Sequence, residues 1–482
     1  MYYGDLNPHS FSYPALFPLV VAAALRGLDV SLRVLQYLGI PWSAGMTATK
    51  TTYMVARLLS AAAGVASVWV SFRIAQRLFD RNTALAAAAL LALAFLHVRD
   101  SHFGVTDIPM TFMVLVAFLF IVRLSESGAT KDLIAAGVMA GLATSTKYNA
   151  ALVCLPAFLA IFADPFAARQ SLETRWRRAA LFASLMVAAF MLTSPYSVLD
   201  FQRFLADVTF ESRHLAEGHG VILGRGWRYH ITSSFRFGLG IPILSAGALG
   251  LLWLFWSNPR RGALVGLFPL SYYLVLGSGY TVFARYMLPV VPFLCLTAAY
   301  AVTEASGWLA ARMHRTSWAP VMATLGVVGL LWPPVVSVVK FDRLIARTDN
   351  RLLARRWIEE RFPPGTTLAQ IGTEPGHVFQ NDPNEVRYVS VRLFPRGRIE
   401  PDVVVVQSSP IMRRQPDMVR IGQILAAAYD LRFAHDVTVG DPGNIYDWQD
   451  EFYLPLTSFK GIERPGPNLK VYVRRGFSPG IR

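Results

Sequence analysis

Charged residues are scarce in this sequence. Only 16% of its 482 residues are Asp, Glu, Lys or Arg and 54% are hydrophobic, whereas soluble domains carry about 25% charged residues. This deficit excludes an ordinary soluble domain and indicates a membrane protein. Lysine is especially rare, because only six of the 46 basic residues are Lys and the net charge of +15 therefore comes from arginine. The basic residues lie between apolar stretches rather than along one soluble face, which argues against nucleic acid as a partner.

Cysteine is also nearly absent. The only two cysteines, Cys154 and Cys295, lie inside apolar stretches. Buried thiols behave as small hydrophobic side chains, so the sequence indicates neither a disulfide framework nor a thiolate metal site. No signal peptide is recognisable ahead of the first apolar stretch.

Long apolar stretches dominate the first 340 residues. A membrane helix needs about 20 mostly apolar residues, and ten stretches come close to that length. A further helical pattern at about 14–38 is interrupted by Arg26, Asp29 and Arg33, which favours a helix lying in the membrane interface. Residues 1–340 are therefore predicted to form a mostly α-helical, polytopic transmembrane bundle. The ten stretches are 52–72, 82–97, 106–123, 132–146, 150–163, 179–195, 234–256, 262–278, 283–302 and 319–339.

The loops between these stretches predict the orientation of the chain. Every second loop holds at least two Arg or Lys, as at 77–81 and 260–261. By the positive-inside rule these loops are cytoplasmic. Loops 98–106 and 196–233, together with the chain after about residue 340, are therefore expected to face outward.

Ionisable side chains gather on this outer side, close to the ends of the apolar stretches. A charge near the hydrocarbon costs about 2.5–3.5 kcal/mol, so such groups usually mark a functional site. The sequence therefore predicts a polar chamber at one face of the membrane. The side chains concerned are His97, Arg99, Asp100, His102, Asp107, Lys147, Glu211, His214 and Arg285.

The composition changes after Lys340, where a small α/β extracytoplasmic domain is predicted for residues 341–482. The pattern there predicts a helix, three strands, a second helix and a last strand. No glycine-rich nucleotide-binding motif occurs among them. In chain order these elements are Asp349–Arg361, Thr367–Ile371, Val386–Val391, Asp402–Gln407, Asp417–Ala428 and Leu469–Arg474.

Seven short motifs occur in a characteristic order along nearly the whole chain. They are Gly4–Pro14 (GDLNPHSFSYP), Arg57–Gly64 (RLLSAAAG), Ser101–Asp107 (SHFGVTD), Gly141–Tyr148 (GLATSTKY), Arg285–Pro292 (RYMLPVVP), Trp357–Glu360 (WIEE) and Arg464–Asn468 (RPGPN). In these motifs the chain resembles the GT-C superfamily of membrane glycosyltransferases, in the branch that includes protein O-mannosyltransferases and lipid A aminoarabinose transferases.

The resemblance implies sugar transfer from a polyprenyl-phosphate donor to a protein, lipid or glycan acceptor. The reaction is expected at the outer face of a bacterial inner membrane. Similar proteins carry a first membrane helix and a catalytic acidic residue before the stretch that matches Gly4–Pro14, and this sequence begins after that point. Asp5 is the nearest carboxylate and is considered as a substitute for that catalytic acid.

The expected reaction needs a carboxylate that acts on the acceptor and cations that neutralise the departing phosphate. Asp107 is the candidate carboxylate, although capping of the following helix would also explain it. Lys147, with Tyr148, and Arg285, with Tyr286, are candidates for binding the carrier phosphate. Snorkelling of Lys147 and interfacial anchoring by Arg285 remain alternatives.

His102, Glu211 and His214 are weaker candidates for substrate binding. Imidazole and carboxylate groups also bind divalent metal ions. Their spacing matches no recognised metal motif, so a divalent ion is left open as a cofactor and no metal ligand is assigned.

Two other classes of protein remain open. A secondary transporter would concentrate polar groups near the membrane midplane and show an internal repeat, whereas here they gather at one face and no repeat is detectable. The second class is a catalytically impaired protein that binds a polyprenyl lipid. It is favoured because the sequence does not contain the catalytic acidic residue that similar proteins carry.

Overall fold

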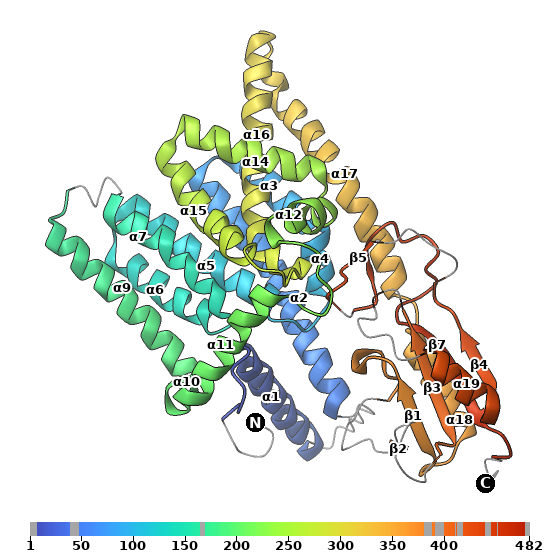
Figure 1. The fold of residues 1–482 in the computed structure, drawn as a ribbon. Helices are drawn as coiled ribbons and strands as arrows, with labels where there is room; N and C mark the ends of the chain where they lie inside the picture. The colour runs from blue at the N-terminus through green and yellow to red at the C-terminus, as the bar shows by residue number, and fades with distance from the viewer. Residues whose placement is uncertain are drawn as a thin grey trace. The chain divides into compact units, whose positions relative to one another are not determined.

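The computed structural model describes residues 7–38, 48–163, 169–379, 388–390, 400–409, 411, 418–438, 445–450 and 452–477. The chain divides into two compact units (Figure 1). The helical unit comprises Met1–Gly218 and Leu223–Val336, and the C-terminal unit comprises His219–Ile222 and Ser337–Arg482. The division predicted at about residue 340 falls within helix α17 (Ala319–Ile345), which runs from the first unit into the second.

The helical unit confirms the predicted mostly α-helical class, because every predicted apolar stretch is largely helical. Its elements are α1 (Leu16–Tyr37), α2 (Ala48–Leu78), α3 (Arg81–Ala92), α4 (Phe95–Ser101), α5 (Asp107–Ser127), α6 (Thr130–Thr144), η1 (Tyr148–Val153), α7 (Cys154–Ala163), α9 (Leu172–Thr193), α10 (Tyr196–Leu199), α11 (Phe201–Glu217), α12 (Gly226–Tyr229), η2 (His230–Phe235), α13 (Arg236–Gly238), α14 (Ile241–Ser257), α15 (Pro259–Leu276), η3 (Ala284–Val290), α16 (Val291–Arg312), η4 (Thr316–Trp318) and the first part of α17.

The chain is an integral membrane protein. Within the described residues, five helices are long and apolar enough to cross a bilayer, and seven spans result if each of two bent helix pairs counts as one. The predicted number of about ten spans stays a prediction. The five helices are Lys50–Leu78, Asp107–Ser127, Leu172–Thr193, Ala284–Arg312 and Thr316–Arg361.

Two stretches that the sequence predicts as single helices are bent in the structure. The pair Arg81–Ala92 and Phe95–Ser101 bends by 57°, and the pair Gly226–Gly238 and Ile241–Ser257 by 117°. At the second bend Gly240 adopts a φ of 83°, a left-handed conformation that interrupts the helix. Pro242 then fits the first turn of the new helix, where its missing N–H has no intrahelical partner to lose.

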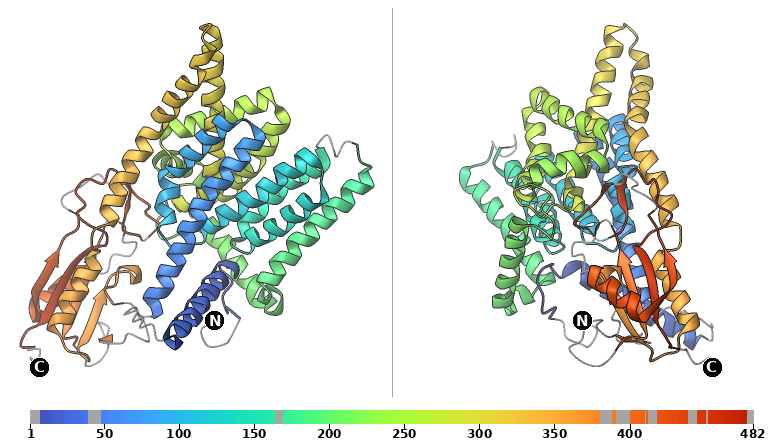
Figure 2. Two further views of the ribbon diagram at one scale, coloured as in Figure 1. Left: turned by 180° about the vertical axis from the view of Figure 1, so that it is seen from behind. Right: turned by 45° about the vertical axis from the view of Figure 1, so that its right-hand side comes forward.

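Small residues allow the helices of this unit to approach closely. α6 packs against α5 and α9, and α14 packs against α16 (Figures 1 and 2). At Gly141 of α6 a Cβ atom would meet the backbone carbonyl of Met186 and the side chain of Ala189, both on α9. Such close contacts between helices are typical of membrane proteins, where packing rather than the hydrophobic effect holds the helices together.

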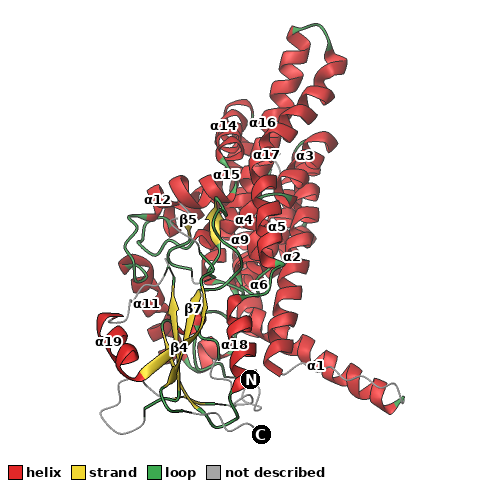
Figure 3. Ribbon diagram, turned by 90° about the vertical axis from the view of Figure 1, so that its right-hand side faces the viewer, coloured by secondary structure: helices red, strands yellow, loops and turns green. Residues whose placement is uncertain are grey.

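Two amphipathic helices leave apolar side chains exposed. α1 extends away from the other helices of its unit (Figure 3) and exposes Val30, Val34 and Tyr37. α11 has no buried residue and exposes Phe201 and Phe210. An exposed apolar stripe on a helix with a polar opposite face suits the membrane interface, the location predicted for residues 14–38.

The C-terminal unit contains the small α/β region predicted from the sequence. Its five-stranded sheet has the order β2-β1-β3-β7-β4, in which β1 is parallel to β2 and β3, and β7 is antiparallel to β3 and β4. A second sheet contains β5 and β6. The elements are α18 (Asn350–Arg361), β1 (Thr367–Ile371), η5 (Glu374–Gly376), β2 (Val389–Ser390), β3 (Val403–Ser408), α19 (Met418–Ala428), β4 (Tyr429–His435), β5 (Ile445–Tyr446), β6 (Pro455–Thr457) and β7 (Asn468–Arg474).

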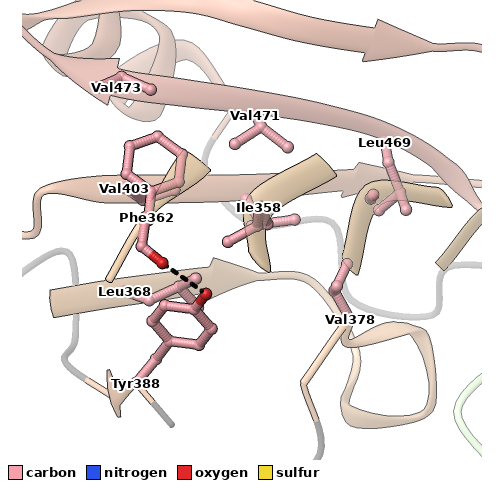
Figure 4. Packing of buried hydrophobic residues seen from close by; sticks show 11 residues of the cluster. Ile358, Phe362, Leu368, Val378, Tyr388, Val403, Leu469, Val471 and Val473 are labelled. Atoms are coloured by element: carbon pink, nitrogen blue, oxygen red, sulfur yellow. Dashed lines mark hydrogen bonds between the residues drawn. The ribbon is translucent and has the colours of Figure 1, made fainter. Parts of the chain in front are cut away.

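A helix covers each face of the larger sheet. Ile358 of α18 packs in one cluster with Val403 and Val405 of β3 (Figure 4). Val404 and Val406, which alternate with them along the strand, pack in the opposite cluster with residues of α19. The side-chain period of two in a strand explains why β3 is apolar throughout. The edge strand β4 was not predicted, because few of its residues are buried and its apolar pattern is weak.

Candidate functional site

Three ionisable side chains from distant parts of the helical unit converge. Asp107 lies in the first turn of α5, Lys147 directly precedes η1, and Arg285 lies in η3. The Lys147 ammonium donates to Asp107 Oδ1 at 2.6 Å, and Arg285 Nε lies 3.6 Å from Asp107 Oδ2. α5 packs against η1 and η3, which brings the three residues together. Thr106 occupies the N-cap of α5 and no side chain caps the helix there, so capping does not account for the Asp107 carboxylate.

The cluster is shielded from solvent and carries excess positive charge. Asp107 is 1% exposed and Lys147 is 9% exposed, and two cations face this single carboxylate. Because the dielectric constant is low where solvent is excluded, the attraction between these opposite charges is stronger than on a protein surface. Lysine and arginine side chains with spare donors provide the chemistry that binds a phosphate group.

Aromatic rings surround the two cations. The Lys147 ammonium lies 4.6 Å from the centre of the Tyr286 ring and 5.9 Å from that of Tyr13. The Arg285 guanidinium lies 4.4 Å from the centre of the Phe283 ring. Cation–π attraction of this kind orients the cations where few solvent molecules reach them.

Tyr272 belongs to this neighbourhood and was not identified from the sequence. It is fully buried in α15, and its side chain interacts electrostatically with Asp107 and Tyr286. Its hydroxyl has no hydrogen-bond partner among the residues that the structure describes. A tyrosine within an apolar stretch does not by itself indicate a functional site, because only the fold places it beside the charged cluster.

Tyr148 lies beside Lys147 in sequence but contacts another element. Its hydroxyl donates to the backbone carbonyl of Phe11 at 3.0 Å, and its ring packs edge-on against Phe204 of α11. The N-terminal segment is also held by the Phe11 N–H, which donates to Asp207 at 2.7 Å. The contacts of Tyr148 therefore anchor the segment that carries Tyr13, and its role in substrate binding stays a prediction.

Glu211 and His214 both lie on α11. Glu211 is partly buried and interacts electrostatically with Tyr148 and Tyr286. The His214 ring stacks on Phe210 with 6.0 Å between ring centres, and its backbone carbonyl accepts a hydrogen bond from the Thr281 hydroxyl. Substrate binding by Glu211 and His214 stays a prediction.

His102 lies at the end of α4, beside an apolar cavity of about 1020 Å³. Its Nδ1 pairs with the backbone carbonyl of Val98 at 2.8 Å, and its own carbonyl accepts from Arg57 Nε at 2.7 Å. The cavity runs along α2 and is lined mainly by apolar side chains, with polar groups such as Ser101 and Arg57 among them.

The described residues do not favour a metal ion in this place. Among them, no group of three or more His, Cys, Asp and Glu is arranged to hold one. Both oxygens of Asp107 face a cation, and these two cations would repel a metal ion. A divalent cofactor stays a prediction. Asp5, the other predicted catalytic residue, lies outside the described residues.

The fold and this cluster define a polytopic membrane protein with a shielded, positively charged site. Residues 42–196 match a family described as dolichyl-phosphate-mannose-protein mannosyltransferase. No protein of curated function matches the sequence.

The fold is similar to that of ArnT from Cupriavidus metallidurans. The superposition on ArnT in the apo state covers 96% of this chain and 88% of the ArnT chain, with a TM-score of 0.54 and 14% sequence identity. The superposition on ArnT bound to undecaprenyl phosphate covers 98% of this chain and 90% of the ArnT chain, with a TM-score of 0.54 and 15% sequence identity. The chain thus resembles GT-C membrane glycosyltransferases of the branch predicted from its motifs.

Proposed function

We propose that this protein transfers a sugar from a polyprenyl-phosphate donor to a protein, lipid or glycan acceptor at the outer face of the bacterial inner membrane. The observation that carries the proposal is the convergence of Lys147 and Arg285 on the buried Asp107. The family match over residues 42–196 supports glycosyl transfer. The similar fold of ArnT, whose structure was determined with undecaprenyl phosphate, supports a polyprenyl-phosphate carrier.

Each member of the cluster has a role in this reaction. When the bond between the sugar and the phosphate breaks, negative charge grows on the phosphate, and Lys147 and Arg285 neutralise it. Asp107 holds both cations in position before the donor binds. The phosphate then competes with this carboxylate for the same donors, so binding requires only a local exchange of partners.

The apolar cavity beside α2 offers a place for the polyprenyl chain. Its volume of about 1020 Å³ is at the upper end of the range of about 300–1,000 Å³ for small-molecule sites. His102 is one of its lining residues, and the loop that follows His102 leads to Asp107. This arrangement suits a long apolar chain whose phosphate lies at the charged cluster.

Release of free undecaprenyl phosphate tests the proposal, because it is a product whatever the sugar and the acceptor. The purified protein, reconstituted in liposomes, is incubated with undecaprenyl phosphates that carry different radiolabelled sugars, and with protein, glycolipid and cell-wall fractions as acceptors. We expect release that depends on one sugar and one acceptor and is lost in Lys147→Ala. Failure of every combination to release more undecaprenyl phosphate than empty liposomes would contradict the proposal.

The outward orientation needs a separate measurement. A cysteine introduced at an exposed position of the C-terminal unit, such as Leu431, is expected to react with an impermeant thiol reagent added to intact spheroplasts. A cysteine at the exposed Trp308, near the end of α16, is expected to react only after lysis. The opposite pattern would place the C-terminal unit in the cytoplasm.

A further inference from the structure

The turn that joins α16 to η4 and α17 is the tip of a hairpin that extends beyond the other helices of the helical unit (Figures 1 and 2). His314 adopts a φ of 53° in this turn, a left-handed conformation that reverses the direction of the chain. The Arg315 N–H donates to the Ala310 carbonyl at 2.9 Å and closes the turn. Arg312, the last residue of α16, and Arg315 are therefore held on the same short loop.

Each of these two arginines stacks on a tryptophan. The Arg312 guanidinium lies 5.1 Å from the centre of the Trp308 ring, one helical turn earlier in α16. The Arg315 guanidinium lies 5.4 Å from the centre of the Trp318 ring. Attraction between the cation and the aromatic face orients each guanidinium, while the N–H groups at its edge stay available as donors. A planar guanidinium held in this way is suited to bind phosphate oxygens.

The positive charge of the two arginines has no carboxylate partner among the described residues. Arg123, in the last part of α5, pairs with Asp132 at 2.8 Å. Arg312 and Arg315 form no such ion pair with any residue that the structure describes, and the sequence contains no Asp or Glu from 305 to 341. The tip therefore carries charge that an anion from outside the chain can neutralise.

The apolar side chains of the tip indicate its depth in the membrane. One apolar span ends at Arg312 and the next begins at Thr316, so the turn falls at the boundary of the hydrocarbon. Trp308 is 59% exposed and Trp318 is 47% exposed. Tryptophan is enriched at the level of the lipid head groups, because its ring is apolar and its N–H is polar. Lipid at this depth covers the two rings and brings phosphate groups beside the two arginines.

We propose that this tip, Trp308–Trp318, binds an anionic phospholipid. Arg312 and Arg315 donate to the phosphate group, and the two tryptophan rings pack on the glycerol and the upper part of the acyl chains. A zwitterionic phospholipid binds more weakly, because its own ammonium group offsets the phosphate charge. The inference is independent of sugar transfer, since no residue of the tip belongs to the cluster around Asp107.

Native mass spectrometry of the purified, delipidated protein tests the site by titration with dioleoylphosphatidylglycerol and with dioleoylphosphatidylcholine. One arginine near an anionic lipid contributes about 5-fold in affinity. The double variant Arg312→Gln/Arg315→Gln is therefore expected to bind phosphatidylglycerol about 30-fold more weakly than the wild type. Its affinity for phosphatidylcholine is expected to stay the same, which also shows that the exposed substitutions leave the protein folded.

The matched control is Arg260→Gln/Arg261→Gln. It removes the same charge from two exposed arginines at the start of α15 that stack on no ring among the described residues. We expect it to bind phosphatidylglycerol like the wild type.

A further double variant separates the planar guanidinium from charge alone. Arg312→Lys/Arg315→Lys keeps both charges but removes the forked donors. Its affinity for phosphatidylglycerol is expected to lie between those of the wild type and the Gln variant. Affinity equal to that of the wild type would contradict binding by oriented guanidinium groups.

Three other results would contradict the proposal. Equal affinity of the wild type for the two lipids would show that the tip does not select an anionic head group. An equal loss in the control Arg260→Gln/Arg261→Gln would attribute the effect to net charge rather than to this site. A dimer that is lost in Arg312→Gln/Arg315→Gln, without preference for either lipid, would make the hairpin an interface between two copies of the chain.

Discussion

The Lys147 ammonium donates a 2.6 Å hydrogen bond to the Asp107 carboxylate, although the two residues are 40 positions apart. The contact joins the end of one apolar stretch to the beginning of another, where Arg285 adds a second cation. Removal of one partner from a buried ion pair costs about 3–5 kcal/mol, because the other charge is left uncompensated. Each member of the cluster therefore affects stability as well as chemistry, and variants must be tested for both.

Replacement of Lys147 by Ala is expected to weaken binding of undecaprenyl phosphate. A hydrogen bond to a charged group contributes about 1.5–3 kcal/mol, which corresponds to a loss of roughly 10- to 150-fold in affinity. Binding of the acceptor is expected to change less. Titration of the purified protein with undecaprenyl phosphate measures the effect, and Lys340→Ala, an exposed lysine on α17, serves as control. Unchanged affinity would favour snorkelling as the role of Lys147.

The isosteric change Asp107→Asn is expected to lower stability and to abolish transfer even in the protein that stays folded and monodisperse. The amide cannot hold Lys147 and Arg285 by charge, so the two side chains lose the ion pairs that position them. Undecaprenyl phosphate is expected to bind at least as tightly as to the wild type, because the anion that competes with it has been removed. Near-normal turnover would remove Asp107 from the site, and weaker binding of the phosphate would contradict its role as a counterion.

The sequence predicted the cluster because charge is costly beside a membrane. Asp107, Lys147 and Arg285 were recognisable as ionisable groups at the ends of apolar stretches, and all three converge. Tyr272 was not recognisable, since its neighbours in sequence are apolar and only the packing of α15 brings it to the site.

Predictions from local pattern were less informative where tertiary contacts decide the outcome. Tyr148 directly follows Lys147 in the sequence, and only the 3₁₀ turn that begins there shows that its hydroxyl donates to the Phe11 carbonyl. The stretch at 234–256 has the composition of one helix, yet Gly240 divides it. The edge strand β4 lacks a regular apolar pattern because few of its side chains are buried.

Replacement of Gly141 by Ala is expected to destabilise the helical unit. A Cβ at this position would overlap the Met186 carbonyl on α9, and overpacking costs about 1–3 kcal/mol. Gly307→Ala is the matched control, because no atom lies within 4 Å of the Cβ position at that helical glycine. There Ala is expected to be neutral or to stabilise by about 0.5–1 kcal/mol through its helix propensity. Unfolding in mixed micelles measures both, and equal effects would contradict close packing of α6 on α9.

The change Tyr148→Phe removes the hydroxyl that donates to the Phe11 carbonyl. The N-terminal segment is expected to open more often, because a lost hydrogen bond costs about 0.5–1.5 kcal/mol. Hydrogen exchange of the amides of residues 11–13, 15 and 16 is therefore expected to become faster, while affinity for undecaprenyl phosphate stays unchanged. Reduced affinity with normal exchange would instead assign Tyr148 to the substrate site.

The stability of the C-terminal unit is expected to depend on pH through His377. Burial is the largest influence on this residue and lowers its pKa from the ordinary value of 6.5, although Glu374 and a backbone hydrogen bond partly oppose the shift. As the pH falls through 6.5, the unfolded chain takes up a proton that the folded unit resists, so the free energy of unfolding decreases. The decrease ends once the pH falls below the pKa of the folded state.

The variant His377→Gln isolates this contribution from those of other titrating groups. Hydrogen exchange of β1 in the full-length protein, corrected for the intrinsic rate at each pH, reports the stability of the unit from about pH 7.5 to about pH 5.5. We expect protection of β1 in the wild type to decline over this interval more steeply than in His377→Gln. Identical pH profiles would show that His377 titrates alike in both states and that its burial imposes no penalty on its protonated form.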